Sequence, residues 1–308
     1  MRDLSPGRPQ LAVLVSGLHE LFGPDLRSFV EVARIADEAG VDQVVLPDHV
    51  VMGARTDRYP YGTFPYDADA PWIEPLTTLA AMASATTRVR LGTGILIAPL
   101  RPAVLLAKTI ATLDVLSGGR VDLGVGVGWQ REEYEALGVP FAGRWQRLDD
   151  TLGACRALWQ DAPASFSSPT VAFDDIWCAP RPVQARVPVW FGAKASEALA
   201  GRIAAVGDGW YPLGNLSPDE LRDGGELMRD AFRAAGRDAA ELGVRWQLAV
   251  RQDGSGRVDV ARTMEPVPAL VDAGVTVLST GINPRIVQTM DDVRAYLDAL
   301  VAAFAALT

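Results

Sequence analysis

The chain has 308 residues, of which 49% are apolar and 22% are charged, and its formal net charge is −9. This composition is typical of a globular protein with a large core, and the acidic balance argues against nucleic acid as the main partner, because nucleic-acid binding favours a basic surface. No apolar run reaches the roughly 18 residues of a membrane span, and no signal-peptide core is evident, so we expect a cytoplasmic protein without a membrane partner.

Strands and helices alternate through the first half of the chain. Short, nearly continuous apolar runs predict strands, and apolar residues at helical spacing between start and stop signals predict helices. The predicted strands are 11–17, 41–47, 88–99 and 120–128, and the predicted helices are 25–40, 73–87, 101–119 and 143–160. Residues 52–72 form a long polar and aromatic loop, and a loop of that length in a compact domain is usually functional or mobile.

The alternation continues more loosely in the second half. The predicted strands are 187–193, 208–214, 244–250 and 275–281, and the predicted helices are 194–207, 217–236 and 289–306. Residues 162–187 are interpreted as an insertion with the character of a hairpin. The two cysteines, Cys155 and Cys178, form no CxxC motif, so we expect reduced thiols rather than a disulfide framework or a metal site.

About eight apolar strands joined by helices predict a parallel sheet that is covered on both faces. Eight such units fit an α/β fold of the (β/α)8 TIM-barrel type, whose active site lies at the carboxyl ends of the strands. An open doubly wound sheet is the alternative, but "LGVGVGWQREE" does not match a GxGxxG motif followed by an acidic residue. We therefore expect residues 1–308 to form a single barrel domain with insertions near 50–73 and 162–187.

The segment "VVLPDHV" places Asp48 and His49 directly after a predicted strand. His49 is one of only two histidines, and a histidine can exchange a proton near neutral pH. Adjacent strand residues point to opposite faces, so these two side chains need not bond each other. The position favours a functional His49, and the alternative is a loop histidine satisfied by a backbone carbonyl. His19 also follows a strand, but in a less patterned context.

The segment "GTGILIAP" ends the third predicted strand and contains Thr93, Gly94 and Ile95. Glycine beside β-branched residues at a strand end suggests a bulge or a strained backbone. Such strain gathers at functional sites, whereas the alternative is a barrel corner into which small residues simply fit.

The segment "GVGVGW" ends the fourth predicted strand and contains Gly126, Gly128 and Trp129. Of the four alternate positions from 122 to 128, three are glycine, and these would leave room in the barrel mouth for a flat ligand. Close packing of a helix on the strand explains the glycines equally well.

The segment "WFGAKASEALAGR" contains Gly192, Ala193, Lys194 and Ser196 between a predicted strand and a predicted helix. Free N–H groups at a helix start, together with a lysine, can bind a phosphate, and such sites recur late in barrels of this kind. The alternative is an ordinary serine-capped helix.

Three glutamates follow the glycine-rich strand, namely Glu132, Glu133 and Glu135. A carboxyl group at a strand end can act as a general acid or base. The favoured interpretation is nevertheless that all three belong to a solvated helix face.

Three segments together resemble the bacterial luciferase-like flavin and deazaflavin oxidoreductases. They are "AGVDQVVLPDHV", the block from "RVRLGTGILIAPLRP" through "GVGVGWQREEYEALGVPF", and "VPVWFGAKASEALAGRIAAVGDGWYPLG". The resemblance covers most of residues 10–215 and is weaker afterwards. It implies a (β/α)8 barrel with insertions, a tricyclic flavin-type cofactor at the strand ends, and a homodimer.

The same resemblance implies roles for particular residues. A nonprolyl cis peptide that supports the cofactor ring is implied between Gly94 and Ile95. A phosphate site for the cofactor is implied at the Gly-Ala segment that carries Lys194 and Ser196.

The Asp-His pair in "PDHV" resembles the deazaflavin branch, which uses coenzyme F420. Luciferase-like FMN monooxygenases often carry Glu-His-His at this place. The resemblance implies that His49 lines the ring and the substrate as a proton donor or acceptor, and that Asp48 contacts the ring or a hydroxyl group. Trp129 stands where some sugar-phosphate dehydrogenases of this branch have a glutamate, so that substrate class is not supported.

We therefore expect an F420-dependent oxidoreductase that transfers hydride between the deazaflavin C5 and a small organic substrate. Aromatic residues of the 52–72 loop would cover an apolar substrate, namely Tyr59, Tyr61, Phe64, Tyr66 and Trp72. One alternative is an FMN-dependent monooxygenase that takes reduced flavin from a partner reductase and reacts with O2. The other is a noncatalytic barrel subunit, which the intact glycine-rich and phosphate-type motifs disfavour.

Overall fold

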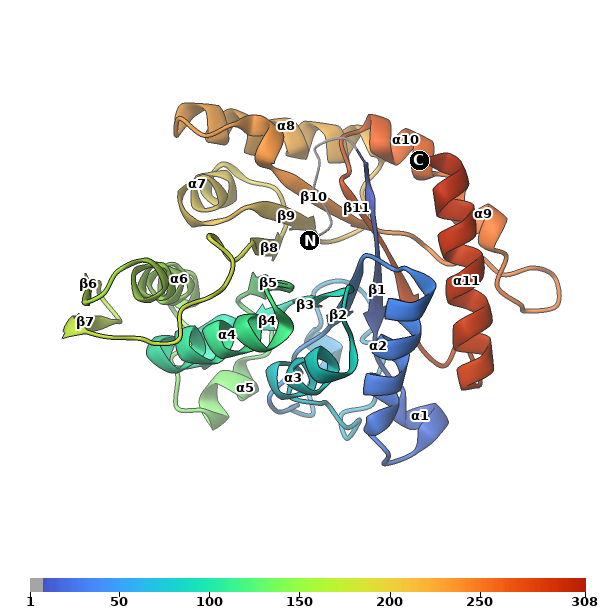
Figure 1. The fold of residues 1–308 in the computed structure, drawn as a ribbon, viewed down its shortest axis with the longest axis horizontal. Helices are drawn as coiled ribbons and strands as arrows, with labels where there is room; N and C mark the ends of the chain where they lie inside the picture. Colours follow the sequence, from blue (N-terminus) through green and yellow to red (C-terminus); the bar gives the residue numbers. More distant parts are fainter. Residues whose placement is uncertain (1–7) are drawn as a thin grey trace.

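The computed structural model describes residues 8–308 and contains nine parallel strands at its centre (Figure 1). They are β1 (Gln10–Val15), β2 (Gln43–Leu46), β3 (Arg90–Thr93), β4 (Leu96–Ile97), β5 (Val121–Gly126), β8 (Val189–Ala193), β9 (Gly209–Pro212), β10 (Gly243–Gln247) and β11 (Val277–Ile282). Hydrogen-bonded neighbours follow the order β3-β2-β1-β11-β10-β9-β8-β5, and β5 also pairs with β3, which closes the ring. The predicted (β/α)8 barrel is confirmed, and the chain does not form the open sheet.

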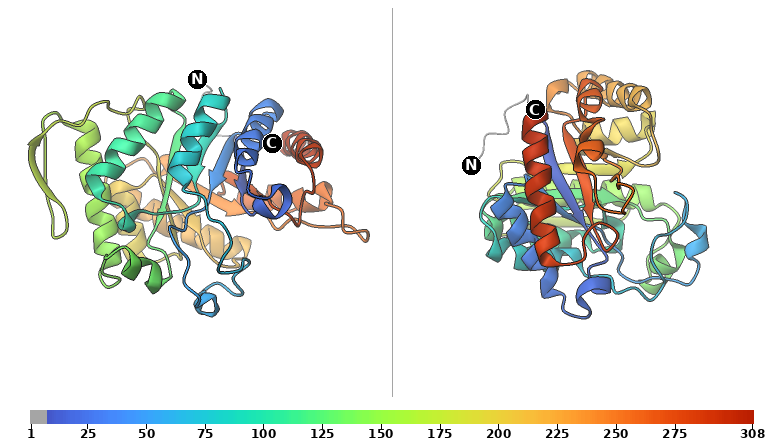
Figure 2. Two further views of the ribbon diagram at one scale, coloured as in Figure 1. Left: turned by 90° about the horizontal axis from the view of Figure 1, so that it is seen from below. Right: turned by 90° about the vertical axis from the view of Figure 1, so that its right-hand side faces the viewer.

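Helices surround the barrel in the two further views (Figure 2). The longer ones are α2 (Arg27–Ala39), α3 (Pro75–Ala85), α4 (Ala103–Ser117), α6 (Arg144–Gln160), α7 (Glu197–Val206), α8 (Pro218–Ala234) and α11 (Met290–Leu307). The short ones are α1 (His19–Phe22), α5 (Arg131–Ala136), α9 (Val260–Met264) and α10 (Val267–Asp272), with 3-10 turns η1 (Thr56–Arg58), η2 (Ala98–Leu100) and η3 (Ala239–Glu241). Within residues 8–308, no helix is both long enough and apolar enough to cross a bilayer.

The 162–187 segment contains the expected hairpin. Its strands β6 (Ala164–Ser167) and β7 (Ala172–Ile176) pair antiparallel and extend outward beside α6 (Figure 1). Because the hairpin lies on the outside of the helical layer, it does not contribute to the barrel mouth.

The strand predicted over 88–99 is split into β3 and β4. Leu91 of β3 pairs with Val121 of β5, and Leu96 of β4 pairs with Val125 of β5. The third barrel strand therefore advances by five residues where β5 advances by four. This one-residue bulge lies at the cis peptide bond between Gly94 and Ile95, as the family motif implied. The bulge places the backbone of the third barrel strand at the mouth of the barrel.

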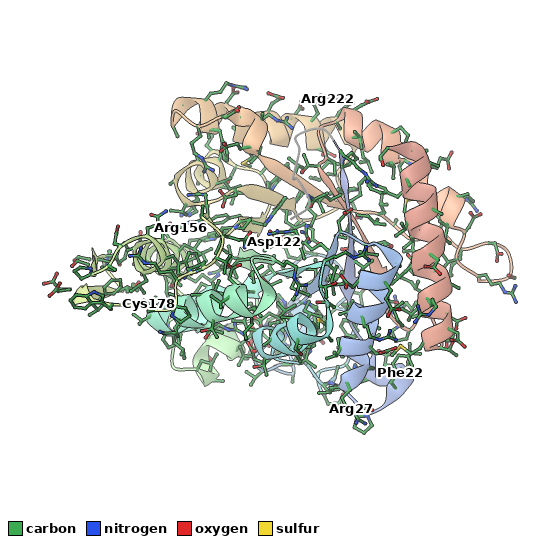
Figure 3. The ribbon with its side chains drawn as sticks, in the orientation of Figure 1. Phe22, Arg27, Asp122, Arg156, Cys178 and Arg222 are labelled. Carbon is green, nitrogen blue, oxygen red and sulfur yellow. The ribbon has the colours of Figure 1, made fainter. Side chains whose placement is uncertain are left out.

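The interior of the barrel near the amino ends of the strands is polar rather than apolar. Asp122 of β5 accepts hydrogen bonds from Arg90 Nε at 2.7 Å and Nη2 at 2.8 Å, and from the Gln43 amide. Gln43 in turn accepts from Arg245, whose guanidinium lies 5.3 Å from the Trp190 ring centroid. The network closes this end of the barrel, and Asp122 lies near the centre of Figure 3.

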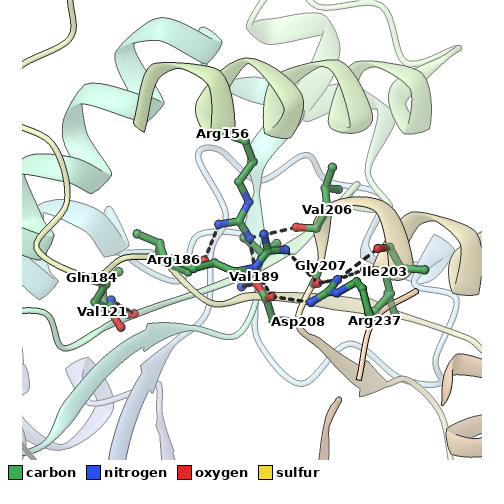
Figure 4. A network of polar contacts seen from close by, with 12 residues as sticks. Val121, Arg156, Gln184, Arg186, Val189, Ile203, Val206, Gly207, Asp208 and Arg237 are labelled. Carbon is green, nitrogen blue, oxygen red and sulfur yellow. Dashed lines mark hydrogen bonds and ion pairs between the residues drawn. The ribbon is translucent and has the colours of Figure 1, made fainter. Parts of the chain in front are cut away.

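A second charged network lies outside the barrel, at the start of β9 (Figure 4). Asp208 accepts from Arg156, Arg186 and Arg237, and these arginines also donate to carbonyls at the end of α7, including that of Gly207. Cations are favourable at a helix carboxyl end, where backbone carbonyls lack partners. We assign this network to stability, because it lies at the amino ends of the strands.

Helix α2 shows how the sequence specifies a barrel helix. Its buried residues include Phe29, Val32, Ala33 and Ala36, which recur at helical spacing and face the strands. The helix ends at Gly40, whose positive φ of 91° suits glycine and whose N–H donates to the Ala36 carbonyl.

Asp37 of α2 gives an acid-sensitive contribution to stability. Its carboxylate accepts backbone N–H bonds from Thr87 at 3.0 Å, Arg88 at 2.8 Å and Val89 at 2.6 Å. Burial alone would raise the pKa of Asp37, but these hydrogen bonds outweigh it and hold the pKa below the ordinary value. A depressed folded-state pKa stabilises the fold above the unfolded pKa of about 3.9, and this contribution is lost as the pH falls through the folded value.

Asp37→Asn is therefore expected to reduce the free energy of unfolding by about 2 kcal/mol at pH 7, because one acceptor oxygen becomes a donor facing backbone N–H groups. The difference from wild type should narrow as the pH is lowered below about 4. Urea unfolding of both proteins across this pH range measures it. A difference that stays constant with pH would contradict the role of the charged form.

Candidate active site

A cavity of about 500 Å³ opens at the carboxyl ends of the barrel strands. Each barrel strand, or the segment that follows it, contributes to its lining: Leu14, His49, Ile95, Trp129, Gly192, Tyr211, Gln247 and Gly281. The volume lies within the range of ligand and cofactor pockets. The convergence predicted for the strand ends is therefore present, and it brings together segments that are far apart in the sequence.

The floor of the cavity is built around Ile95. A Cβ atom added to Gly126 would lie 2.6 Å from Ile95 Cδ1, and one added to Gly192 would lie 2.6 Å from Ile95 Cγ2. A Cβ added to Gly128 would similarly lie 3.0 Å from Ile97 Cγ2. These glycines make room for the bulged third strand, so the space that they leave, for which a flat ligand and close packing were equally good explanations, is partly filled by isoleucine side chains.

Thr93 is buried below this floor. Its Oγ1 donates to the Gly124 carbonyl at 2.6 Å and so ties β3 to β5. Among the predicted cofactor residues, Thr93 and Gly126 are not cavity-lining, whereas Gly94 and Gly128 are.

His49 lies in the wall of the cavity, and 9% of its side chain is exposed. Its ring centroid is 4.7 Å from that of Trp72, 5.9 Å from Phe64 and 6.1 Å from Trp129, each in an edge-to-face arrangement. Its Nδ1 lies 3.3 Å from Oε2 of Glu133. A buried imidazole therefore stands at the cavity with a carboxyl partner behind it.

The interpretation of Glu133 as part of a solvated helix face is wrong. Its side chain is fully buried, and its second oxygen accepts from the Val50 N–H at 2.6 Å. Glu132 forms only a partly exposed ion pair with Arg58, and Glu135 is exposed, as expected. The one indication in the sequence was position, because Glu133 lies in the first turn after β5, next to the barrel mouth.

Asp48 points away from solvent and holds the bulged strand. Its side chain accepts from the Ile97 N–H at 2.8 Å and from both terminal nitrogens of Arg101 at 2.7 and 3.0 Å. Arg101 also donates to Glu74 at 2.9 Å. Burial lowers the pKa of Arg101, but the carboxylates outweigh it and the pKa is raised. Both Asp48 oxygens are thus engaged by the protein, and the sequence had not indicated Arg101.

The 192–196 segment runs from the cavity to a neighbouring surface pocket. Gly192 and Ala193 line the cavity, whereas Lys194 lines the second pocket, and Leu213 borders both. Ser196 caps α7 by accepting from the Leu199 N–H at 3.2 Å, which was the alternative interpretation. The two pockets are therefore neighbours on either side of Leu213.

The aromatic loop covers one side of the cavity. Tyr59, Phe64 and Trp72 line it together with Trp129, and Tyr66 donates from its hydroxyl to Ser16 at 2.7 Å. Burial raises the pKa of Tyr59 and of Tyr66.

Two indole nitrogens of this wall, those of Trp72 and Trp129, are buried and have no hydrogen-bond partner in the described part of the chain. Buried donors of this kind are normally satisfied. These two N–H groups are therefore unsatisfied polar groups within the aromatic wall. No cluster of three or more potential metal ligands occurs within residues 8–308.

Sequence comparison gives one family and several relatives. The profile of the family described as luciferase-like monooxygenase matches residues 5–267. An uncharacterized protein of Mycobacterium tuberculosis (strain ATCC 25618 / H37Rv) is 32% identical over 277 residues, which is 89% of this chain and 92% of the relative.

Two relatives differ in the cofactor that their names give. An F420-dependent glucose-6-phosphate dehydrogenase of Amycolatopsis mediterranei is 32% identical over 227 residues, covering 72% of this chain and 61% of the relative. An FMNH2-dependent dimethylsulfone monooxygenase of Pseudomonas putida is 27% identical over 235 residues, covering 75% of this chain and 60% of the relative.

Proposed function

Because this chain belongs to the luciferase-like monooxygenase family, we propose that it is an F420-dependent oxidoreductase acting on a small apolar organic molecule. The observation that carries the proposal is the position of His49, a proton-exchanging group held at the wall of a cofactor-sized cavity. The Asp-His pair at this place favours the deazaflavin over the flavin.

The residues of the cavity fit a flat, largely apolar ring. Ile95 and Val127 supply an apolar floor, and the rings of Trp72 and Trp129 supply an aromatic wall. Lys194 and Ala195, which precede α7, line the adjoining pocket, and Lys194 would hold the phosphate of the cofactor there. Gly192 and Ala193 would connect the two parts of the site.

A bound deazaflavin supplies hydride transfer at its C5, and the protein supplies orientation and proton exchange. His49 would hold or move the proton at the substrate oxygen or nitrogen through its Nε2, because Nδ1 faces Glu133. Asp48 would act indirectly by fixing the backbone of the bulged strand at Ile97, rather than by contact with the ring.

The aromatic loop would exclude water and select an apolar substrate. Phe64 and Trp72 contact His49, Tyr59 contacts Phe64, and none of the three side chains carries a charge near neutral pH. Apart from His49, the only acidic or basic residue of the lining is Asp48, and its carboxylate is neutralised by Arg101. A sugar phosphate would meet no exposed cation on this wall.

The second candidate is an FMN-dependent monooxygenase that receives reduced flavin from a partner reductase. It is favoured by the relative from Pseudomonas putida, whose name states FMNH2 dependence. The same cavity could hold the isoalloxazine ring of FMN, so its shape does not separate the two candidates. They differ in the cofactor and in the use of O2.

The first experiment is a parallel fluorescence titration of the purified protein with F420 and with FMN. We expect a Kd for F420 about tenfold or more below that for FMN. Gly192→Ala is expected to weaken F420 binding by about tenfold, because the new methyl group displaces Ile95 into the cavity. Gly201→Ala, on the outer helix α7 with open space at the same position, is the matched control.

Tighter binding of FMN, together with oxygen consumption on addition of reduced FMN, would replace the first candidate by the second. Binding of neither cofactor would favour a noncatalytic barrel.

A further inference from the structure

We propose that Glu133 is the positioning residue of the site, and that it holds the neutral His49 ring in the tautomer that carries its proton on Nδ1. The consequence is that Nε2 keeps its lone pair for the cavity. The role of that lone pair in catalysis rests on the function proposed above, but the tautomer does not.

The geometry gives each Glu133 oxygen one partner. Oε1 accepts from the Val50 N–H at 2.6 Å, and a backbone N–H can only donate. Oε2 lies 3.3 Å from His49 Nδ1. A carboxylate can only accept hydrogen bonds. With Glu133 in the carboxylate form, as we propose, the atom that faces Oε2 must carry the proton. The hydrogen bond made by one imidazole nitrogen decides which tautomer is present.

The carboxylate is held firmly enough to act in this way. Gln130, directly before α5, makes two hydrogen bonds with the backbone of Gly53. Its Oε1 accepts from the Gly53 N–H at 2.7 Å, and its Nε2 donates to the Gly53 carbonyl at 3.1 Å. A Cβ atom on Gly53 would lie 2.8 Å from Glu132 Cβ, which shows how closely the two segments approach. The segment that carries His49 is therefore attached to the start of α5 at several points.

A purely structural role would need only the contact with Val50. That contact uses one oxygen and leaves the other facing a single group, the His49 ring, in a place without solvent. The aromatic rings around His49 offer edges and faces but no acceptor for Nδ1–H. Glu133 is thus the group that can define both the orientation and the protonated nitrogen of the ring.

The test uses the imidazole 15N spectrum of the full-length protein, which contains only two histidines. The His19→Asn variant lacks the His19 signals, so the imidazole signals that remain belong to His49. The sample is titrated upward from about pH 6.5, the ordinary histidine pKa, until each ring is neutral. We expect neutral His49 to keep its proton on Nδ1.

Glu133→Gln presents one carbonyl oxygen and one amide NH2 to the same two partners. Because the Val50 N–H cannot change, the amide oxygen should stay with it and the NH2 should face Nδ1. The proton of neutral His49 is then expected to move to Nε2. Glu135→Gln makes the same chemical change at an exposed position of the same helix and should leave the spectrum unchanged.

Activity gives the second readout. With any substrate that the wild type turns over, Glu133→Gln should lower kcat by about 100-fold or more, as expected for a wrong tautomer, while KM and the cofactor Kd change by less than about threefold.

A wild-type spectrum with the proton on Nε2 would overturn the proposal, even if Glu133→Gln failed to fold. So would a folded Glu133→Gln protein whose His49 keeps Nδ1–H. If neither F420 nor FMN binds but the tautomer is as expected, the proposed function fails while the positioning role of Glu133 stands.

Discussion

Replacing His49 with asparagine is expected to lower kcat by about 10²- to 10⁴-fold, which is the usual contribution of a general acid or base. The asparagine amide can still donate to Glu133 from the place of Nδ1, so the buried carboxylate keeps a partner and the fold should persist. Nothing then replaces Nε2 at the cavity. The Kd for the cofactor should change little, because the floor at Ile95 is untouched.

The measurement is the rate of cofactor oxidation or reduction in stopped flow, with a substrate that the wild-type protein turns over. His19→Asn is the matched control, since it makes the same change at the other histidine, which does not line the main cavity. It should retain the wild-type rate within about twofold. A His49→Asn enzyme with wild-type kcat would remove His49 from the mechanism.

Replacing Asp122 with alanine is expected to reduce the free energy of unfolding by about 3–5 kcal/mol, the usual effect of removing one partner of a buried ion pair. Asp122 is the shared acceptor of Arg90 and Gln43 inside the barrel. Loss of Asp122 leaves the largely buried Arg90 guanidinium without its negatively charged partner. Because Gln43 also binds Arg245, the disturbance should spread across the barrel interior.

Urea or thermal unfolding measures this effect. Asp219→Ala removes the exposed ion pair with Arg222 and should change stability little, because solvent and salt screen such pairs. If the two variants lost similar stability, the interior network would not be what anchors the amino end of the barrel.

The positions of several strand-end residues followed from local pattern. Apolar runs of strand length and helices at regular spacing predicted the barrel, because both patterns arise from backbone geometry within a few residues. The barrel places strand ends together, which predicted that His49, Ile95, Trp129 and Gly192 would share one mouth. The family motif also located the cis bond after Gly94.

Other parts of the site depended on distant neighbours. Glu133 looked like one of three glutamates on a polar helix, and only closure of the barrel brings it to His49, 84 positions earlier. Arg101 showed no distinguishing pattern, yet it neutralises Asp48 across 53 positions. Gly126 could have served a ligand or a packed side chain, and the bulge at Ile95 decided for the side chain.

The sequence by itself therefore determined the fold class, the elements and the strand ends at which chemistry is placed. Those features are encoded in periodicity and in residue types that act over one or two turns. Only the tertiary structure decided which carboxylates are buried, what each one binds, and which glycines make room for a neighbouring side chain. The physical reason is that burial and pairing are properties of contacts between segments, and the chain must close into a barrel before those contacts exist.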